Sequence, residues 1–202
     1  MVAQIVFHSL CCLGIFIGSV GWGAARTFLI CNLEFLLRAC CEIVATWFGC
    51  GRSPVAPGTV GSAAALLFFP FAITSFTVGF VLFSVLMVLG IFAVTQYLKC
   101  HPEVSDPKEV VVDEVCGQLL VFVIIAALVQ SGSICLRSTD GSLWFMLLTG
   151  FVTFRVFDIV KPWPICFVDK NIKGALGVML DDTAAAMPAA VVTLAVMSVV
   201  VM

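Results

Sequence analysis

Residues 113–136 read DEVCGQLLVFVIIAALVQSGSICL: two acids, then a run that contains no charge. A helix needs about 20 mainly apolar residues to cross the hydrocarbon core of a bilayer, and residues 117–136 satisfy that requirement alone. Ionised carboxylates beside such a helix are unfavourable, by about 2.5–3.5 kcal/mol each if they are drawn to the bilayer centre. The stretch therefore predicts a membrane span with an acid pair at one end.

The composition extends this prediction to the whole chain. Of its 202 residues, 62% are apolar and 11% are charged, whereas charged residues make up about 25% of a typical soluble domain. Ten lysines and arginines stand against twelve acids, which leaves no basic surface for nucleic acid. These values exclude a soluble globular domain, a disordered chain and a nucleic-acid binder. They favour an all-α, multi-helix integral membrane bundle in contact with membrane lipid.

Further charge-free segments indicate where the other membrane helices lie. Residues 2–22 and 183–202 are each long enough for one crossing. Residues 53–98 are long enough for two crossings, with a bend within residues 70–75. Residues 141–154 are short for a crossing and either recruit uncharged neighbours or pack inside the bundle. The number of spans therefore stays open.

Residues 27–48 show a different pattern. Glu34, Arg38 and Glu42 are four apart and form one charged stripe, while most of the remaining positions are apolar. Such a pattern is typical of an amphipathic helix that lies at the membrane surface or packs on a bundle. The sequence therefore predicts a surface amphipathic helix near the N-terminus.

The distribution of lysine and arginine predicts an orientation in the membrane. If residues 62–98 and 115–157 each form a hairpin, three loops emerge on one side and residues 137–140, which carry only Arg137, emerge on the other. The positive-inside rule places the three richer loops in the cytoplasm. No basic segment precedes the first apolar run, so we expect no cleaved signal peptide. The three loops carry Arg52, Lys99, Lys108, Arg155, Lys161, Lys170 and Lys173.

The first segment able to carry chemistry is residues 49–62, which read GCGRSPVAPGTVGS. Its glycines allow a ligand to approach the backbone closely, and Pro57-Gly58 predicts a turn. Thr59 or Ser62 is expected to cap the helix that follows. Backbone N–H groups at such a loop-to-helix junction form a natural anion site. Because most loops rich in glycine and proline are only connectors, both interpretations stay open.

The second segment is the acid pair Asp113 and Glu114, which immediately precedes the charge-free run. A divalent cation is a suitable partner for two adjacent carboxylates. Acids also favour the first turn of a helix, where they interact with its dipole. The pair is therefore either a cation site or a helix cap.

The third segment combines residues 154–164, FRVFDIVKPWP, with residues 174–182, GALGVMLDD. Arg155 and Asp158 are three apart and share a helix face. The residue before a proline is pushed out of the α region, so Lys161 should leave the helix end as a flexible cation. The alternatives are a buried Arg155–Asp158 ion pair and a helix cap formed by the second acid pair, Asp181 and Asp182.

Considered together, these groups favour a phosphoryl-transfer site. Carboxylates would hold Mg²⁺, and cations with a glycine loop would hold phosphate oxygens. The candidate catalytic residues and metal ligands are Asp113, Glu114, Asp158, Asp181 and Asp182. The candidate phosphate-binding residues are Arg155, Lys161, Gly58, Thr59, Gly61 and Ser62.

These motifs resemble, in order and approximate spacing, those of the phosphatidylglycerophosphatase A family. The resemblance covers about residues 48–190. It implies that residues 49–202 form a catalytic membrane domain. Residues 1–48 fall outside the resemblance, and their hydrophobic and amphipathic patterns predict N-terminal helices in one folding unit with that domain. The chain departs from the family pattern at Ala185-Ala186, where the family usually has Ala-Gly. The missing glycine puts the packing of the last helix in doubt.

The resemblance implies an Mg²⁺-dependent lipid phosphatase of the bacterial cytoplasmic membrane, with its active site facing the cytoplasm. Its substrate would be phosphatidylglycerophosphate, hydrolysed to phosphatidylglycerol and inorganic phosphate. Attack by water and an aspartyl-phosphate intermediate both stay open. The alternative from another class is a small carboxylate-based proton or cation carrier, whose acids should be spread through the middles of its helices.

Overall fold

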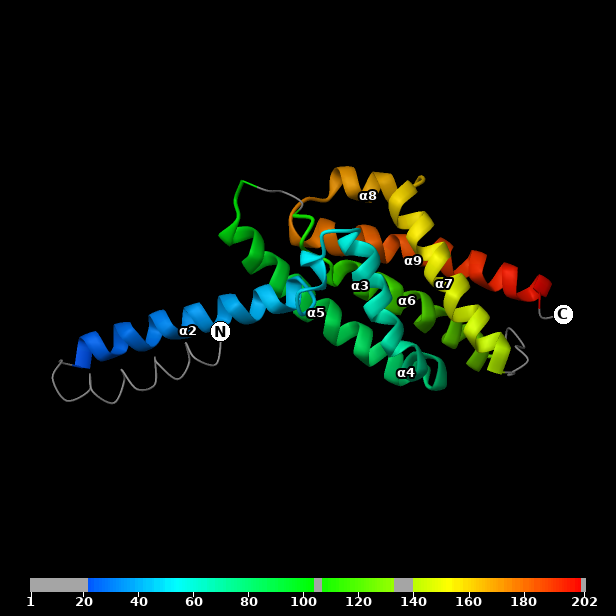
Figure 1. Cartoon of the computed structure of the whole chain (residues 1–202), viewed down its shortest axis with the longest axis horizontal. Helices are drawn as coiled ribbons and strands as arrows, with labels where there is room; N and C mark the ends of the chain where they lie inside the picture. Colours follow the sequence, from blue (N-terminus) through cyan, green and yellow to red (C-terminus); the bar gives the residue numbers. More distant parts are fainter. Residues whose placement is uncertain (1–21, 104–106, 133–139, 201–202) are drawn as a thin grey trace. The chain divides into compact units, whose positions relative to one another are not determined.

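The computed structural model describes residues 22–103, 107–132 and 140–200, and these residues form helices and no strands (Figure 1). The elements run, in chain order, α2 (Trp22–Ala45), η1 (Cys50–Arg52), α3 (Pro57–Ala65), η2 (Leu66–Phe68), α4 (Phe69–Thr74), α5 (Phe76–Cys100), α6 (Val112–Gln130), α7 (Asp140–Val160), α8 (Ile165–Asn171) and α9 (Ala175–Val200).

Five helical segments among the described residues are long and apolar enough to cross a membrane. They are Pro57–Thr74, Phe76–Cys100, Val112–Gln130, Gly141–Val160 and Ala175–Val199. This confirms the all-α membrane bundle. The predicted span at residues 2–22 lies outside the described residues, except for Trp22.

The helices extend beyond the charge-free runs that predicted them. Residues 53–98 hold two spans, as predicted, and the break falls at Ser75, whose hydroxyl accepts a hydrogen bond from the Val78 N–H. At the other helix ends, α6 begins five residues before the predicted start at 117, and α7 continues to Val160. Backbone hydrogen bonding continues through charged turns as long as the charged side chains face the protein interior rather than lipid. Segments 112–116, 155–160 and 175–182 are therefore helical as well as charged.

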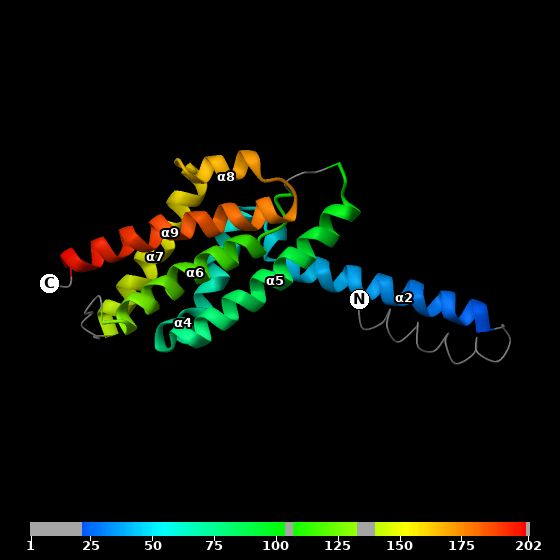
Figure 2. The same cartoon turned by 180° about the vertical axis from the view of Figure 1, so that it is seen from behind.

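Helix α6 is the central element of the bundle. It packs against α9, α5, α3, α4 and α7, and Figure 2 shows it running between α5 and α9. Leu119, Phe122 and Ile125 are fully buried, and the Phe122 ring meets Phe69 edge to face at 4.9 Å between centroids. Because it is surrounded by protein, α6 can carry polar groups at a membrane depth where a lipid-facing helix cannot.

Small residues bring α9 close to its neighbours. Ala185, Ala186, Ala189 and Ala190 are all fully buried in the core that α6, α7 and α9 share. Small side chains allow the backbones of membrane helices to approach closely. The alanine pair that departs from the family pattern is therefore part of a well-packed interface.

The chain divides into two compact units, Met1–Cys40 and Cys41–Met202. In the first unit the described residues belong to α2, where Glu34, Arg38 and the apolar side chains of residues 33–38 are exposed. Glu42, the third member of the charged stripe, lies in the second unit, is partly exposed and pairs with Arg52. The predicted amphipathic segment, residues 27–48, is helical as far as Ala45, and residues 46–48 form a turn. Its location at a membrane surface stays a prediction.

Within the second unit, the loop that leads into α6 is fixed by backbone contacts. The Val111 N–H donates to the Ala45 carbonyl at 3.0 Å, and the Tyr97 hydroxyl donates to the Glu109 carboxylate at 3.1 Å. Gly51 lies directly against the Glu109 backbone, so a Cβ at that position would overlap the Glu109 carbonyl. These contacts fix the position of the first turn of α6 relative to its neighbours, and this turn carries Asp113 and Glu114.

We expect Gly51→Ala to destabilise the protein by about 1–3 kcal/mol, because the added methyl group would push against the backbone rather than a flexible side chain. The thermal unfolding midpoint in detergent should fall. Gly141→Ala is the matched control, since a Cβ there meets nothing within 4 Å. Equal midpoints for the two variants would contradict this account of the loop.

Candidate active site

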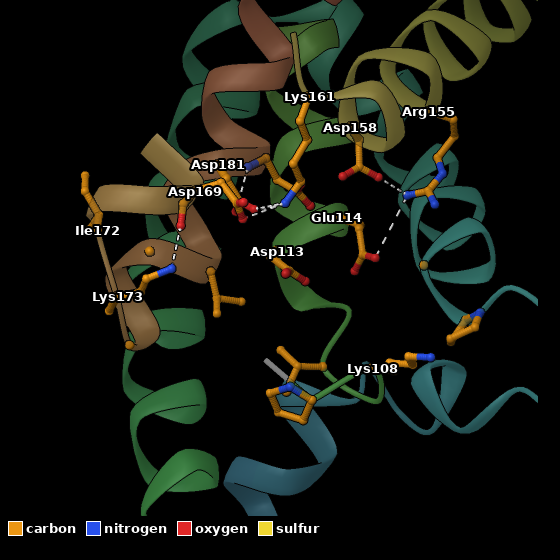
Figure 3. Close-up of a pocket in the computed structure, with 18 of the residues that line it drawn as sticks. Lys108, Asp113, Glu114, Arg155, Asp158, Lys161, Asp169, Ile172, Lys173 and Asp181 are labelled. Atoms are coloured by element: carbon orange, nitrogen blue, oxygen red, sulfur yellow. Dashed lines mark hydrogen bonds and ion pairs between the residues drawn. The ribbon is translucent and has the colours of Figure 1, made fainter. Parts of the chain in front are cut away.

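The charged ends of three membrane helices surround one cavity of about 630 Å³ (Figure 3). The first turns of α6 and α9, the last turns of α7 and the loops beside them supply its polar walls. The cavity is therefore built from segments far apart in the sequence. Its charged lining residues are Lys108, Asp113, Glu114, Arg155, Asp158, Lys161, Asp169, Lys173, Asp181 and Asp182.

Three of the acids form a tight cluster. Asp113, Glu114 and Asp182 each offer one carboxylate oxygen, and these oxygens all lie within 4.8 Å of one another. One oxygen of each acid, Oδ1, Oε2 and Oδ2 respectively, is buried without a hydrogen-bond partner in the described part of the chain. Buried carboxylates that face one another without donors are strongly unfavourable. The donor set therefore fits a hard divalent cation such as Mg²⁺, which prefers carboxylate oxygens.

The close approach of α3 to this cluster depends on Gly58. A Cβ at this position would overlap the Glu114 carboxylate and lie 3.2 Å from the Arg155 Nη2 atom. Pro57, whose fixed φ suits the first position of a helix, begins α3 immediately before it. The Pro57-Gly58 pair thus places the first turn of α3 against the acid and the arginine.

Arg155 is held between two carboxylates. Its Nη1 atom lies 2.5 Å from the Asp158 Oδ2 atom and 3.9 Å from the Glu114 Oε1 atom. The same nitrogen donates to the Ser62 hydroxyl at 3.3 Å. The expected ion pair exists, and it lies in the wall of the cavity, so the structural and the functional interpretations of Arg155 are compatible.

Lys161 leaves the end of α7, as predicted, but it is not a free cation. Its backbone has a φ of 42°, and its amine pairs with Asp181 and, at 3.0 Å, with the Asp169 Oδ1 atom. Burial disfavours the charge on Lys161, but hydrogen bonds and attraction to Asp181 and Asp169 outweigh burial and raise the pKa of the amine above its ordinary value. The lysine therefore stays protonated.

The five predicted acids thus fall into two groups. Asp113, Glu114 and Asp182 form the cluster with unpartnered oxygens, while Asp158 and Asp181 neutralise the two cations. The Asp182 N–H donates to the Asp181 carboxylate at 3.0 Å, which links the groups. The geometry brings all five to the same cavity.

The predicted phosphate-binding loop is only partly on the cavity. Gly58 lines it, whereas Thr59, Gly61 and Ser62 are not among the lining residues. The prediction that Thr59 or Ser62 caps the helix is wrong: α3 begins at Pro57 after Ala56, and both residues lie inside it. The Ser62 hydroxyl instead donates to the Gly58 carbonyl at 2.9 Å.

The sequence alone did not single out four polar residues near the site. Lys108, Asp169 and Lys173 line the cavity. All three lie next to the motifs quoted above, and this proximity in sequence could have identified them as candidates. Gln118, one helical turn beyond Glu114, is fully buried, and neither of its amide atoms has a hydrogen-bond partner in the described residues. An amide close to the start of the apolar run that follows the acid pair was its signal.

The chain is similar to a known enzyme family. The family model described as Phosphatidylglycerophosphatase A matches residues 43–197. A phosphatidylglycerophosphatase A of Escherichia coli K12 is 35% identical over 149 residues, which cover 71% of this chain and 76% of that protein. The Haemophilus influenzae Rd protein of the same name is 32% identical over 156 residues, which cover 77% and 87%.

A third relative carries a different name. A Bacteroides thetaiotaomicron protein, provisionally assigned as a phosphatidylinositol-3-phosphatase, is 34% identical over 149 residues, which cover 71% of this chain and 84% of that protein. No solved structure matches the chain. The relatives therefore agree on a lipid phosphatase and differ in the polyol that carries the phosphate.

We expect Gly58→Ala to lower phosphatase turnover by about 100-fold, because a displacement of about 1 Å at a reacting centre has an effect of that size. The added Cβ has to displace the Glu114 carboxylate or the Arg155 guanidinium. Turnover is measured as initial phosphate release, beside Gly141→Ala as control. Wild-type turnover in a folded Gly58→Ala protein would remove the first turn of α3 from the site.

Proposed function

Because the chain belongs to the phosphatidylglycerophosphatase A family, and so is a phosphatase acting on a phosphate monoester, we propose that it hydrolyses phosphatidylglycerophosphate. The products are phosphatidylglycerol and inorganic phosphate, and the setting is bacterial phospholipid synthesis. The single observation that carries the proposal is the cluster of Asp113, Glu114 and Asp182, with its unpartnered oxygens, in a cavity that Arg155 and Lys161 also line.

In this proposal Asp113, Glu114 and Asp182 hold Mg²⁺. A bound divalent cation neutralises charge on the phosphoryl group and lowers the pKa of a coordinated water. Arg155 and Lys161 donate hydrogen bonds to the phosphoryl oxygens, and electrostatic stabilisation of this kind is usually the largest part of such catalysis. Asp158 and Asp181 hold these two cations in position.

Two routes for the phosphoryl group are compatible with these roles. In the first, a water molecule attacks phosphorus while one carboxylate accepts its proton. In the second, a carboxylate attacks phosphorus, the P–O bond to phosphatidylglycerol breaks and this alcohol leaves; water then hydrolyses the aspartyl phosphate to inorganic phosphate and the free carboxylate. Both routes need an acid beside the phosphorus atom and positive charge near the leaving oxygen. The cavity offers the carboxylates together with Arg155 and Lys161.

The alternative of a proton or cation carrier has weaker support. A carrier needs acids along the length of its helices. In the described spans, the acids of the cavity occupy the first two turns of α6 and α9 and the last turn of α7. They line one pocket at one end of the bundle. This arrangement is suited to a catalytic site, whereas a carrier needs a continuous path for the ion across the membrane.

We also propose that the protein lies in the cytoplasmic membrane with the cavity facing the cytoplasm. The cavity wall carries Lys108, Arg155, Lys161 and Lys173. Positive residues of short loops favour the cytoplasmic side. The substrate would then reach the site from the inner leaflet.

Purified protein in detergent should release phosphate from phosphatidylglycerophosphate with Mg²⁺ and lose this activity in excess chelator, because the three acids otherwise repel one another and the anionic substrate. Phosphatidic acid and phosphatidylinositol 3-phosphate, assayed in parallel, define the range of substrates. Activity should return when Mg²⁺ is added back. Full activity in chelator would defeat the metal role, and phosphate release from phosphatidic acid alone would defeat the proposed substrate.

Asp182→Asn should reduce turnover by about 100-fold or more, the size of effect seen when one preorganised charged or polar group is removed from a site. The amide keeps the shape of the side chain but weakens its attraction for a cation. Glu103→Gln, an exposed acid that does not line the cavity, is the control. Comparable turnover in the two variants, both folded, would exclude Asp182 from the site.

A further inference from the structure

Two of the four cations that line the cavity have no carboxylate partner in the described part of the chain. Arg155 and Lys161 are each paired with acids. Lys108 is exposed and makes no ion pair with any described residue, and the Lys173 amine donates at 3.0 Å to the backbone carbonyl of Asp169. The two lysines therefore have positive charge available for a ligand.

The two lysines come from different loops that meet at the cavity. Lys108 belongs to the segment that precedes α6, and Lys173 to the segment between α8 and α9. Figure 3 draws their side chains on either side of Asp113, outside the group formed by Asp181, Lys161 and Glu114. The acids and paired cations thus occupy the middle of the site, and the unpaired lysines lie beside it.

Exposed apolar residues follow the α7 end that supplies Arg155 and Asp158. Trp163 is 80% exposed, and Ile159 and Val160, shortly before it in the chain, are exposed as well. Tryptophan is enriched at the headgroup level of membranes. The pattern favours a location of this helix end near the headgroup phosphates of lipids.

The proposed substrate carries two phosphates with different chemistry. The terminal phosphate is a monoester, which the enzyme cleaves. The other is a diester, which joins the same glycerol to the lipid and keeps one negative charge. When the monoester lies at the acid cluster, the diester is held only three carbons away, and it needs a second cationic partner. A lysine ammonium, a compact charge with three donors, suits such an anion.

From these observations we propose that Lys173, whose amine the Asp169 carbonyl holds beside the site, binds the lipid phosphodiester of the substrate, so that the enzyme selects lipids whose headgroup carries both a phosphodiester and a terminal phosphate monoester. Lys108 lies on the opposite side of Asp113 (Figure 3), so the same phosphodiester does not contact it. The inference rests on the proposed function and adds the recognition of the second phosphate. It separates such lipids from phosphatidic acid, which has a monoester and no diester.

The test uses the purified full-length chain in neutral detergent micelles, with phosphatidylglycerophosphate as substrate. The probe is the product phosphatidylglycerol, which has the diester and lacks the monoester, used as a competitive inhibitor. In Lys173→Met, both KM and the inhibition constant for phosphatidylglycerol should rise about 10-fold, the effect of one lost hydrogen bond to a charged group. The inhibition constant for inorganic phosphate should rise much less. Lys173→Arg should retain most of the binding.

Lys170→Met is the matched control, because Lys170 is an exposed lysine of α8 that does not line the cavity. Unchanged inhibition by phosphatidylglycerol in Lys173→Met would overturn the inference. So would an equal rise in Lys170→Met, which would show a general effect of surface charge. A wild-type chain that releases no phosphate from phosphatidylglycerophosphate contradicts the proposed function itself, and the inference falls with it.

Discussion

The mutual repulsion of Asp113, Glu114 and Asp182 is the constraint around which the site is organised. Their oxygens lie within 4.8 Å of one another, and one oxygen of each has no hydrogen-bond partner among the described residues. Charges interact more strongly when water is excluded, so packing has to hold these helices together against the repulsion, and the cation that we propose would relieve it. The bundle supplies the packing through α6, which most of the other helices contact. The contacts of Gly51 and Gly58 bring a loop and a third helix against the same acids.

The membrane environment explains why the site lies at the helix ends. Charged side chains that face lipid are unfavourable, whereas those that face a polar cavity in the protein are not. In α6, α7 and α9 the apolar stretches face lipid or the core, and the charged turns continue the same helices around the cavity. An enzyme that cleaves a headgroup needs its reactive groups at this depth, close to the interface and shielded from the acyl chains.

The two groups of acids make different contacts in the site. Asp158 and Asp181 neutralise Arg155 and Lys161 and hold them in place, and the other three acids are the ligands that we propose for a metal ion. Lys173 has no carboxylate partner in the described residues, and this difference suggests that it binds a second phosphate. Selectivity and catalysis would then depend on different cations, which substitutions can separate.

The sequence by itself determined the membrane bundle, the segments that cross and the residues that carry charge at their ends, because these follow from local hydrophobicity and from the length needed to cross a bilayer. It also predicted five of the six acids of the cavity, because charged residues beside an apolar helix are unfavourable unless they have a partner; Asp169 was the exception. It did not determine where the helices begin, because a charged turn stays helical when its neighbours bury it; Thr59 and Ser62 accordingly lie inside α3. Only the tertiary structure decided which acids lie together, which of them pair with a cation and which lysines stay unpaired. The Arg155–Asp158 pair is local, but other contacts join residues far apart in the chain, such as Glu114 with Arg155, and no local pattern encodes the distance between them.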